Sequence, residues 1–384
     1  MARHITPVSL ARAASARTTP ADATYMAAAL KLARLGIGRT SPNPVVGAVI
    51  VKDGRMIGAD YHHRAGLPHA EALALRRAGE HARGATLYTT LEPCDHTGRT
   101  PPCTDAILRA GIARVVVAAL DPNPITNGRG IARLRRAGVP VTTGVLRSEA
   151  ERLNEPFRKA MVERLPYVIA KIGQSLDGKI ATIRGESQWI TSPASRRLTH
   201  QLRGRVDAML VGVNTILRDD PRLTVRGARS RPGHPVNVIV DSHLRTPPSA
   251  RCLRASSPVI LATTSFGSAA RAARYRQRRV EVIPFASRTG RVPLRALFRL
   301  LAQRGIQSML IEGGGELLAG ALHERLVDRV AFFIAPRLIG GRAAPGAVGG
   351  PGVARLNQTL PLEEMTVRRI GPDLLVEARV AYPR

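Results

Sequence analysis

Apolar and polar positions in the first half of the chain change between two periods, one typical of strands and the other of helices. Short apolar runs at 45–58, 85–91 and 113–120 predict strands. The first run turns back at Asp53-Gly54, which is a strong hairpin signal between apolar segments. Apolar residues with helical spacing lie before and between these runs and predict helices over 22–36, 68–79 and 103–111.

Residues with clear positional preferences set the expected limits of these helices. Asp22 is the expected N-cap of the first helix, which stops at Gly36. The second helix opens at Pro68-His69 and ends at Gly79, because proline suits a helix start and glycine its end. Strands and helices that alternate in this way predict an α/β domain.

The alternation resumes after a polar amphipathic helix that is predicted over 148–166 and ends at Pro166. Ser192 as N-cap and Pro193 at the first position predict a further helix over 192–205. Further apolar runs predict strands at 167–173, 206–213, 236–241, 258–264 and 308–314. We therefore expect two α/β domains, 23–165 and 166–384.

The N-terminal segment differs from both predicted domains. Residues 1–21 contain Arg, Ser, Thr and Ala but no acidic residue, which is the composition of a transit peptide. The segment shows little sustained amphipathic pattern, so we favour a disordered extension over residues 1–22.

Length and composition exclude several classes of protein. A chain of 384 residues with 44% hydrophobic residues is globular and long enough for more than one core. No apolar run approaches the roughly 18–20 residues that span a bilayer. Three cysteines cannot build a disulfide framework, so we expect a reducing compartment, the cytoplasm.

The formal net charge of +30 raises the question of a nucleic-acid partner. The basic residues are spread along the chain, and only 3% of residues are aromatic, so there is little to stack on bases. A general bias toward Arg explains the charge, and attraction of phosphorylated ligands is the alternative. We expect a small-molecule partner and a homo-oligomer, without nucleic acid or membrane.

Candidate metal ligands lie in two short motifs. His69 and Glu71 form His-x-Glu at the start of a predicted helix, and Cys94 and Cys103 lie in "LEPCDHTGRTPPC". One imidazole and two thiolates suit Zn²⁺ and leave its fourth position open for water, which is the arrangement of a catalytic site. Glu71 is the candidate proton carrier, in the pattern of zinc deaminases. A structural site completed by His96 or Asp95 is the alternative.

The motifs "SPNPVVGAVIVKDG", "HHRAGLPHAEALAL" and "TLEPCDHTGRTPPC" resemble the deaminase half of the bifunctional riboflavin-biosynthesis deaminase/reductase family. The eight residues between the cysteines distinguish this family from deaminases with Cys-x-x-Cys. The resemblance implies a cytidine-deaminase-like three-layer domain and places Asn43 and His62 at the substrate. A turn role for Asn43 and a surface position for His62 are the alternatives. Asp95 departs from the small or neutral residue that is frequent after the first cysteine.

Motifs such as "KIGQSLDGKIA" and "IEGGGELLAGAL" in the second half resemble the reductase half of the same family, which implies a dihydrofolate-reductase-like fold and NADPH. The glycine-rich turn can bring the backbone close to the cofactor, and the following helix start can bind its phosphate; a plain turn is the alternative. The resemblance places at the cofactor Gly173, Trp189, Thr215, Asp219, Ser242, Gly313, Gly314 and Gly315. It places at the reductase substrate Ser187, Arg203, Leu223, Arg226 and Glu312.

Some of these roles have physical support and some have none. Arg203 and Arg226 suit a phosphate, because a guanidinium binds it through two donors. Core packing is the alternative role for Trp189, the only tryptophan of the chain. Lys171 and Asp177 are candidate site residues without an assigned step, and Cys252 has no partner motif.

The implied chemistry has two steps. Zinc-dependent hydrolysis removes an amino group from 2,5-diamino-6-ribosylamino-4(3H)-pyrimidinone 5′-phosphate. NADPH then reduces the ribosyl group to give 5-amino-6-ribitylamino-uracil 5′-phosphate. The competing hypotheses are a nucleic-acid deaminase of the tRNA type with a basic accessory domain, and a zinc-stabilised binding module without activity.

Overall fold

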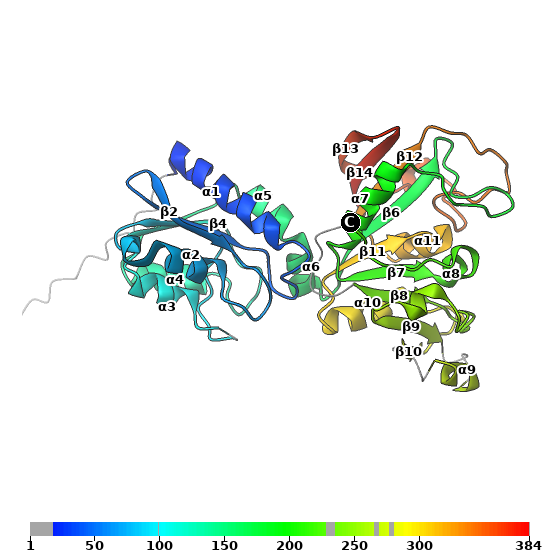
Figure 1. The fold of residues 1–384 in the computed structure, drawn as a ribbon, viewed down its shortest axis with the longest axis horizontal. Coiled ribbons are helices and arrows are strands. Elements are labelled where there is room, and N and C mark those ends of the chain that lie inside the picture. Colours follow the sequence, from blue (N-terminus) through cyan, green and yellow to red (C-terminus); the bar gives the residue numbers. More distant parts are fainter. Residues whose placement is uncertain (1–17, 99, 228–234, 265–268, 276–279, 384) are drawn as a thin grey trace, which may run out of the picture. The chain divides into compact units, whose positions relative to one another are not determined.

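The computed structural model describes residues 18–98, 100–227, 235–264, 269–275 and 280–383. The chain divides into two compact units, a first unit of residues 1–162 and a second unit of residues 163–384 (Figure 1). Each has its own hydrophobic core. The expected second domain, from Pro166, starts three residues after the second unit does.

The first unit is built on a five-stranded sheet of order β2-β1-β3-β4-β5. Its strands are β1 (Gly47–Lys52), β2 (Arg55–Tyr61), β3 (Thr86–Leu91), β4 (Arg114–Ala119) and β5 (Val141–Thr143). The β1–β2 and β1–β3 pairs are antiparallel, and the β3–β4 and β4–β5 pairs are parallel. The hairpin predicted at Asp53-Gly54 joins β1 to β2.

Helices cover both faces of this sheet, which confirms the predicted three layers (Figure 1). One face carries α1 (Pro20–Ala33) and α5 (Arg147–Leu153). The other carries α2 (Ala70–Ala78), α3 (Cys103–Arg109) and α4 (Arg129–Arg136). In the chain, α5 is followed by α6 (Glu155–Glu163).

The second unit is built on a nine-stranded sheet of order β10-β9-β8-β7-β11-β6-β12-β14-β13. Seven neighbouring strands are parallel, and β14 and β13 add an antiparallel edge. The strands are β6 (Tyr167–Ser175), β7 (Ala208–Gly212), β8 (Val236–Val240), β9 (Val259–Thr264), β10 (Val280–Phe285), β11 (Ser308–Glu312), β12 (Arg329–Ala335), β13 (Leu362–Ile370) and β14 (Asp373–Val380). The helices are α7 (Pro193–Arg203), α8 (Val213–Asp219), α9 (Ala269–Ala273), α10 (Leu294–Gln303) and α11 (Gly315–His323).

The predicted N-cap of the first helix is wrong. Thr19 caps α1, and Asp22 lies one turn into the helix as the second half of a capping box. Asp22 is fully buried and accepts two hydrogen bonds from Arg114 and one from Tyr88. Helix α1 therefore begins inside the expected extension of residues 1–22, of which residues 1–17 lie outside the described part.

The single helix predicted over 148–166 is also wrong, because the chain breaks it at Asn154 into α5 and α6. The Asn154 side chain accepts a hydrogen bond from the Val45 N–H and donates one to the Val45 carbonyl, both at 2.9 Å. This contact joins residues 109 positions apart and ties the junction of α5 and α6 to the segment before β1, so the amphipathic pattern alone does not predict it.

No helix in the described part of the chain has both the length and the apolar character needed to cross a membrane.

Candidate active sites of the two units

Two helix starts and one strand end converge on a candidate metal centre in the first unit. His69 is the N-cap of α2, Cys103 is the first residue of α3, and Cys94 follows β3. The ligand atoms of these three residues all lie within 4.8 Å of one another. His69 Nδ1 lies 3.3 Å from the Cys103 sulfur and 3.5 Å from the Cys94 sulfur, so Nδ1 is the nitrogen that faces the cysteines.

These donors fit Zn²⁺, since one imidazole and two thiolates provide three ligands and leave one tetrahedral position open. Among the described residues, the group of mutually close donors contains neither His96 nor Asp95. Asp95 accepts hydrogen bonds from Thr104 and Arg133, and His96 lies 3.4 Å from the Thr126 hydroxyl. The alternative of a structural site completed by His96 or Asp95 therefore has no support in the geometry.

Glu71 lies in the first turn of α2 and is almost fully buried. One carboxyl oxygen lies 3.6 Å from the Cys103 sulfur, and the other lies 3.5 Å from the Thr89 hydroxyl. Burial raises the pKa of this carboxyl. A carboxyl group beside these donors could accept and return the proton of a water that the metal would hold.

Asn43 and His62 form a short chain of hydrogen bonds beside this centre. His62 is buried, which contradicts the alternative of a surface histidine, and burial lowers its pKa to about 4. The neutral ring donates from Nδ1 to the Pro68 carbonyl at 3.2 Å, so Nε2 accepts from the Asn43 amide at 3.1 Å. This arrangement leaves the Asn43 carbonyl oxygen as the group available to a ligand.

A buried carboxylate that the sequence analysis missed supports the strand end that carries Cys94. Glu92 accepts hydrogen bonds from the N–H groups of Asp121, Gly128 and Ile131, and so holds the start of α4. A Cβ on Gly130 would lie 1.9 Å from the Pro93 carbonyl oxygen, so only glycine fits there. The feature of the sequence that could have indicated this close approach is the pair of glycines in "GRG", at 128 and 130.

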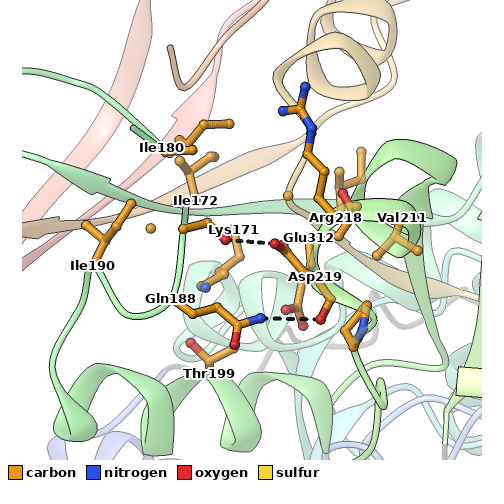
Figure 2. Close-up of a pocket in the computed structure, with 18 of the residues that line it drawn as sticks. Lys171, Ile172, Ile180, Gln188, Ile190, Thr199, Val211, Arg218, Asp219 and Glu312 are labelled. Carbon is orange, nitrogen blue, oxygen red and sulfur yellow. Dashed lines mark hydrogen bonds between the residues drawn. The ribbon is translucent and has the colours of Figure 1, made fainter. Parts of the chain in front are cut away.

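The second unit contains a cavity of about 820 Å³ at the carboxyl ends of β6, β7 and β11 (Figure 2). Lys171, Gln188, Asp219 and Glu312 come to its walls from different elements. Most of the predicted reductase residues line it: Gly173, Ser187, Trp189, Arg203, Thr215, Asp219, Leu223, Arg226, Glu312, Gly313, Gly314 and Gly315.

The charged wall of this cavity centres on Arg203 and Glu312. Arg203 Nε and Nη2 donate to the two Glu312 carboxylate oxygens at 2.6 and 2.7 Å, and Nη1 donates to the Thr224 carbonyl. Burial opposes ionisation of Glu312, but Arg203 outweighs it and lowers the pKa of the carboxyl. Burial also lowers the pKa of the Lys171 amine, which lies in the same wall.

Trp189 lines the cavity with 62% of its surface exposed, which contradicts the alternative of core packing. The Arg196 guanidinium lies 4.7 Å from the centre of its ring. Nearby, the Ser187 hydroxyl donates to Asp219 at 2.7 Å, so a predicted substrate residue and a predicted cofactor residue touch each other.

The glycine-rich turn forms the start of α11 at the cavity wall. Gly313 and Gly314 have φ values of 69° and 78°, in the region that favours glycine. A Cβ on Gly313 would lie 3.3 Å from the Thr215 hydroxyl. The turn therefore brings its backbone to the cavity, where the N-terminus of a helix can bind an anion.

Three residues from the sequence analysis lie elsewhere. Ser242 is absent from the described cavity lining, and its hydroxyl accepts a hydrogen bond from the Val292 N–H. Asp177 accepts hydrogen bonds from the N–H groups of Ile339 and Gly340 and so holds a loop. Cys252 is a buried free thiol.

Comparison with known families agrees with this division into two units. Residues 19–119 match the cytidine and deoxycytidylate deaminase zinc-binding region, and residues 166–376 match the RibD C-terminal domain. The riboflavin biosynthesis protein RibD of Aquifex aeolicus is 44% identical over 356 residues, which are 92% of this chain and 97% of that protein. The RibD protein of Escherichia coli is 43% identical over 364 residues, 92% of this chain and 98% of its own.

Solved structures give the same result. Acinetobacter baumannii RibD superposes with a TM-score of 0.85 at 36% identity and covers 94% of this chain and 99% of its own. A diaminohydroxyphosphoribosylaminopyrimidine deaminase/5-amino-6-(5-phosphoribosylamino)uracil reductase of Thermotoga maritima gives a TM-score of 0.83 at 35% identity, with the same coverage. This chain belongs to the RibD family of riboflavin biosynthesis proteins, and it joins a zinc-dependent deaminase domain to a reductase domain.

Proposed function

We propose that the first unit deaminates 2,5-diamino-6-ribosylamino-4(3H)-pyrimidinone 5′-phosphate and that the second unit reduces the product to 5-amino-6-ribitylamino-uracil 5′-phosphate. The observation that carries the proposal is the presence in one chain of the His69, Cys94 and Cys103 cluster beside Glu71 and of a large cavity with a glycine-rich helix start. The two activities in the name of the Thermotoga maritima relative support this choice of substrate.

In the first unit, His69, Cys94 and Cys103 would hold the metal. When bound, Zn²⁺ lowers the pKa of water toward neutrality and so makes hydroxide available for attack on the ring. Glu71 accepts one proton of the attacking water and delivers it to the ring nitrogen. It then takes the remaining hydroxyl proton of the tetrahedral intermediate and delivers it to the amino group, which leaves as ammonia. Its burial between the cysteines and Thr89 keeps the proton transfer away from bulk solvent.

Asn43 orients the pyrimidine in this proposal. Its NH₂ group is bound to His62, so its carbonyl oxygen accepts a hydrogen bond from a donor on the pyrimidinone edge. His62 is therefore the residue that determines which end of the amide faces the ring.

In the second unit, bound NADPH would supply a hydride to C1′ of the ring-opened imine form of the ribosyl group, and solvent or the substrate would supply the proton that completes the amine. The start of α11 at Gly313–Gly315 would hold a cofactor phosphate, and Trp189, Thr215 and Asp219 would line the rest of the cofactor site. The cofactor role of Ser242 stays a prediction, because Ser242 is not among the described residues that line the cavity. Its hydroxyl accepts a hydrogen bond from the Val292 N–H.

The reductase substrate would lie against Ser187, Arg203, Leu223, Arg226 and Glu312 in the same cavity. Arg203 is bound to Glu312 through two donors, so the exposed Arg226 is the more available cation for the substrate phosphate. This differs from the equal roles that the sequence suggested for the two arginines.

A coupled assay tests the proposal. Ammonia release and NADPH oxidation are measured on the pyrimidinone phosphate, with zinc content determined on the same sample. We expect both activities with one zinc per chain, and little NADPH oxidation when the substrate has not been deaminated. Deamination of tRNA or single-stranded DNA without activity on the pyrimidinone would instead establish the nucleic-acid deaminase.

We further propose a cytoplasmic homo-oligomer. Three free cysteines, two of them at the metal centre, support a reducing compartment.

Strand β13 supports the homo-oligomer. It is an edge strand of its sheet, and Leu362, Met365 and Val367 are between 46% and 63% exposed on it. A second copy of the chain is the partner that these exposed apolar side chains on an edge strand favour. Light scattering is expected to show an oligomer that Met365→Lys dissociates; a monomeric wild-type protein would contradict it.

A further inference from the structure

Two of the three predicted metal ligands, Cys94 and Cys103, are joined by a long loop that must keep their sulfur atoms close together. Cys94 and Cys103 stand at its ends, nine positions apart, and closing such a loop costs conformational entropy. Two contacts close it directly: the Thr104 N–H donates to the Cys94 carbonyl at 3.2 Å, and the Cys103 N–H donates to the Cys94 sulfur at 3.4 Å.

A second set of contacts closes the same loop from outside the donor set. Asp95, the residue after the first cysteine, accepts a hydrogen bond at 2.7 Å from the hydroxyl of Thr104, the residue after the second. The same Asp95 oxygen accepts a bond at 2.7 Å from Arg133 Nη1, and Arg133 Nη2 donates to Asp105. We call Asp95, Thr104, Asp105 and Arg133 the loop clamp.

The loop clamp is anchored on α4, which the fold holds in place independently. Glu92 binds the N–H groups of Gly128 and Ile131 in the first turn of α4, and Gly130 packs directly on the Pro93 carbonyl. Arg133 follows one turn later on this helix and reaches both ends of the cysteine loop. Residues on both sides of Cys94 are therefore attached to the same helix.

We propose that the loop clamp is a positioning group for the zinc centre: Arg133, through Asp95 and Asp105, holds Cys94 and Cys103 at the separation that the metal requires and slows its release. The proposal rests on the assignment of His69, Cys94 and Cys103 as the ligands. Asp95 acts through the loop and is not a ligand. Groups that support metal ligands in this way typically change metal affinity by about 10–100-fold when they are removed.

The test measures zinc release from the full-length holoprotein into an excess of a chromophoric chelator. Asp95→Ala and Arg133→Met are each expected to release zinc about tenfold faster than the wild type. The double variant is expected to release zinc faster than either one but by less than the product of the two effects, because both substitutions break the Asp95–Arg133 contact. Arg136→Met is the control on α4 for charge without contact: among the described residues Arg136 donates to the Ala132 carbonyl of its own helix and acts on Asp95 through its charge. Its release rate is expected to stay close to that of the wild type.

A second readout separates positioning from general loss of structure. With Co²⁺ in place of zinc, the variants are expected to keep the tetrahedral thiolate absorption while they release the metal faster. NADPH oxidation by the second unit, measured on the deaminated substrate, is expected to stay unchanged. Asp95→Asn keeps an oxygen that can accept both hydrogen bonds, so its release rate is expected to lie between those of the wild type and Asp95→Ala; it serves also if Asp95→Ala does not fold.

Two different failures are distinguishable. Wild-type release rates in Asp95→Ala, Asp95→Asn and Arg133→Met would overturn the loop clamp while leaving the ligands intact. A wild-type protein that binds no zinc would overturn the assignment of the ligands, and the loop clamp with it. Equal acceleration in Arg136→Met would also overturn the proposal, since it would trace the effect to α4 as a whole.

Discussion

Arg203 and Glu312 meet inside the reductase cavity as a two-donor ion pair, although they are 109 positions apart in the chain. Arg203 comes from the end of α7 and Glu312 from the end of β11. Both side chains are largely buried, so each charge depends on the other for its solvation.

Removal of one partner is therefore expected to destabilise the second unit. Arg203→Met leaves the Glu312 carboxylate buried without its cation, which typically costs about 3–5 kcal/mol. Urea unfolding of the second unit measures this loss. Replacing both residues together, by Arg203→Met with Glu312→Leu, is expected to restore much of the stability but no NADPH oxidation. A single variant as stable as the wild type would show that the pair does not support the fold.

Gly130→Ala is expected to impair deamination without touching a reacting group. The added Cβ would lie 1.9 Å from the Pro93 carbonyl oxygen, so α4 and the segment before Cys94 must separate. A shift of about 1 Å at a catalytic group can cost roughly 100-fold in rate, and we expect a loss of that order in ammonia release. Gly320→Ala is the control, because its Cβ meets only Leu294 Cδ1 at 3.5 Å. Unchanged deamination in Gly130→Ala would show that the close approach is not needed.

Glu71→Gln is expected to separate metal binding from catalysis. The amide keeps the shape of the side chain but cannot carry the proton, so deamination should fall by at least about 100-fold, the lower end of the usual contribution of a general acid–base group. Zinc content should stay at the wild-type level, and so should NADPH oxidation when the deaminated intermediate is supplied as substrate. Glu80→Gln, at an exposed position shortly after α2, is expected to be neutral. Deamination at the wild-type rate would remove Glu71 from the mechanism.

The stability of the first unit is expected to fall in acid through Asp22. Burial raises the pKa of this carboxyl, but hydrogen bonds from Arg114, the Thr19 backbone and Tyr88 outweigh it and hold the pKa at about 2, below the ordinary value of 3.8. Asp22 therefore contributes stability that is fully present above about pH 4 and is lost as the pH falls toward 2. The shift corresponds to about 2 kcal/mol.

Asp22→Asn tests this contribution. The variant is expected to be less stable than the wild type at pH 7, and the difference is expected to shrink between pH 4 and pH 2. Unfolding by denaturant at several pH values measures it. Asp53→Asn, in the exposed turn between β1 and β2, is the control and keeps a residue that suits the turn. A constant difference from pH 7 to pH 2 would contradict the role given to Asp22.

Local sequence signals predicted the framework of both sites. The sequence predicted both ends of α2 correctly, with His69 as its N-cap and Glu71 in its first turn. Cys103 begins α3 as expected. Ser192 and Pro193 start α7 as their preferences predict. These features depend on a few neighbouring residues, through hydrophobic period and capping, and so they can be read along the chain.

Local sequence signals gave the wrong prediction where a side chain binds a residue far away in the chain. Asp22 has the preference of an N-cap, but Thr19 takes that place and Asp22 binds Arg114, 92 positions away. Asn154 lies in an amphipathic pattern, yet it binds the Val45 backbone across 109 positions and interrupts the helix. The spacing of His, Glu and Cys predicted the metal ligands, but neither that pattern nor the resemblance to the family gave Asp95 a role.

The sequence by itself determined the two α/β domains, the three candidate zinc ligands and the family, because these depend on periodicity, capping and ordered motifs. Only the tertiary structure decided that Asp95 binds Arg133, that Arg203 binds Glu312, and that His62 is buried against Asn43. Each of these contacts forms between elements that the sheet brings together. No pattern along the chain specifies which side chains meet there, since that depends on how both sheets and their helices pack.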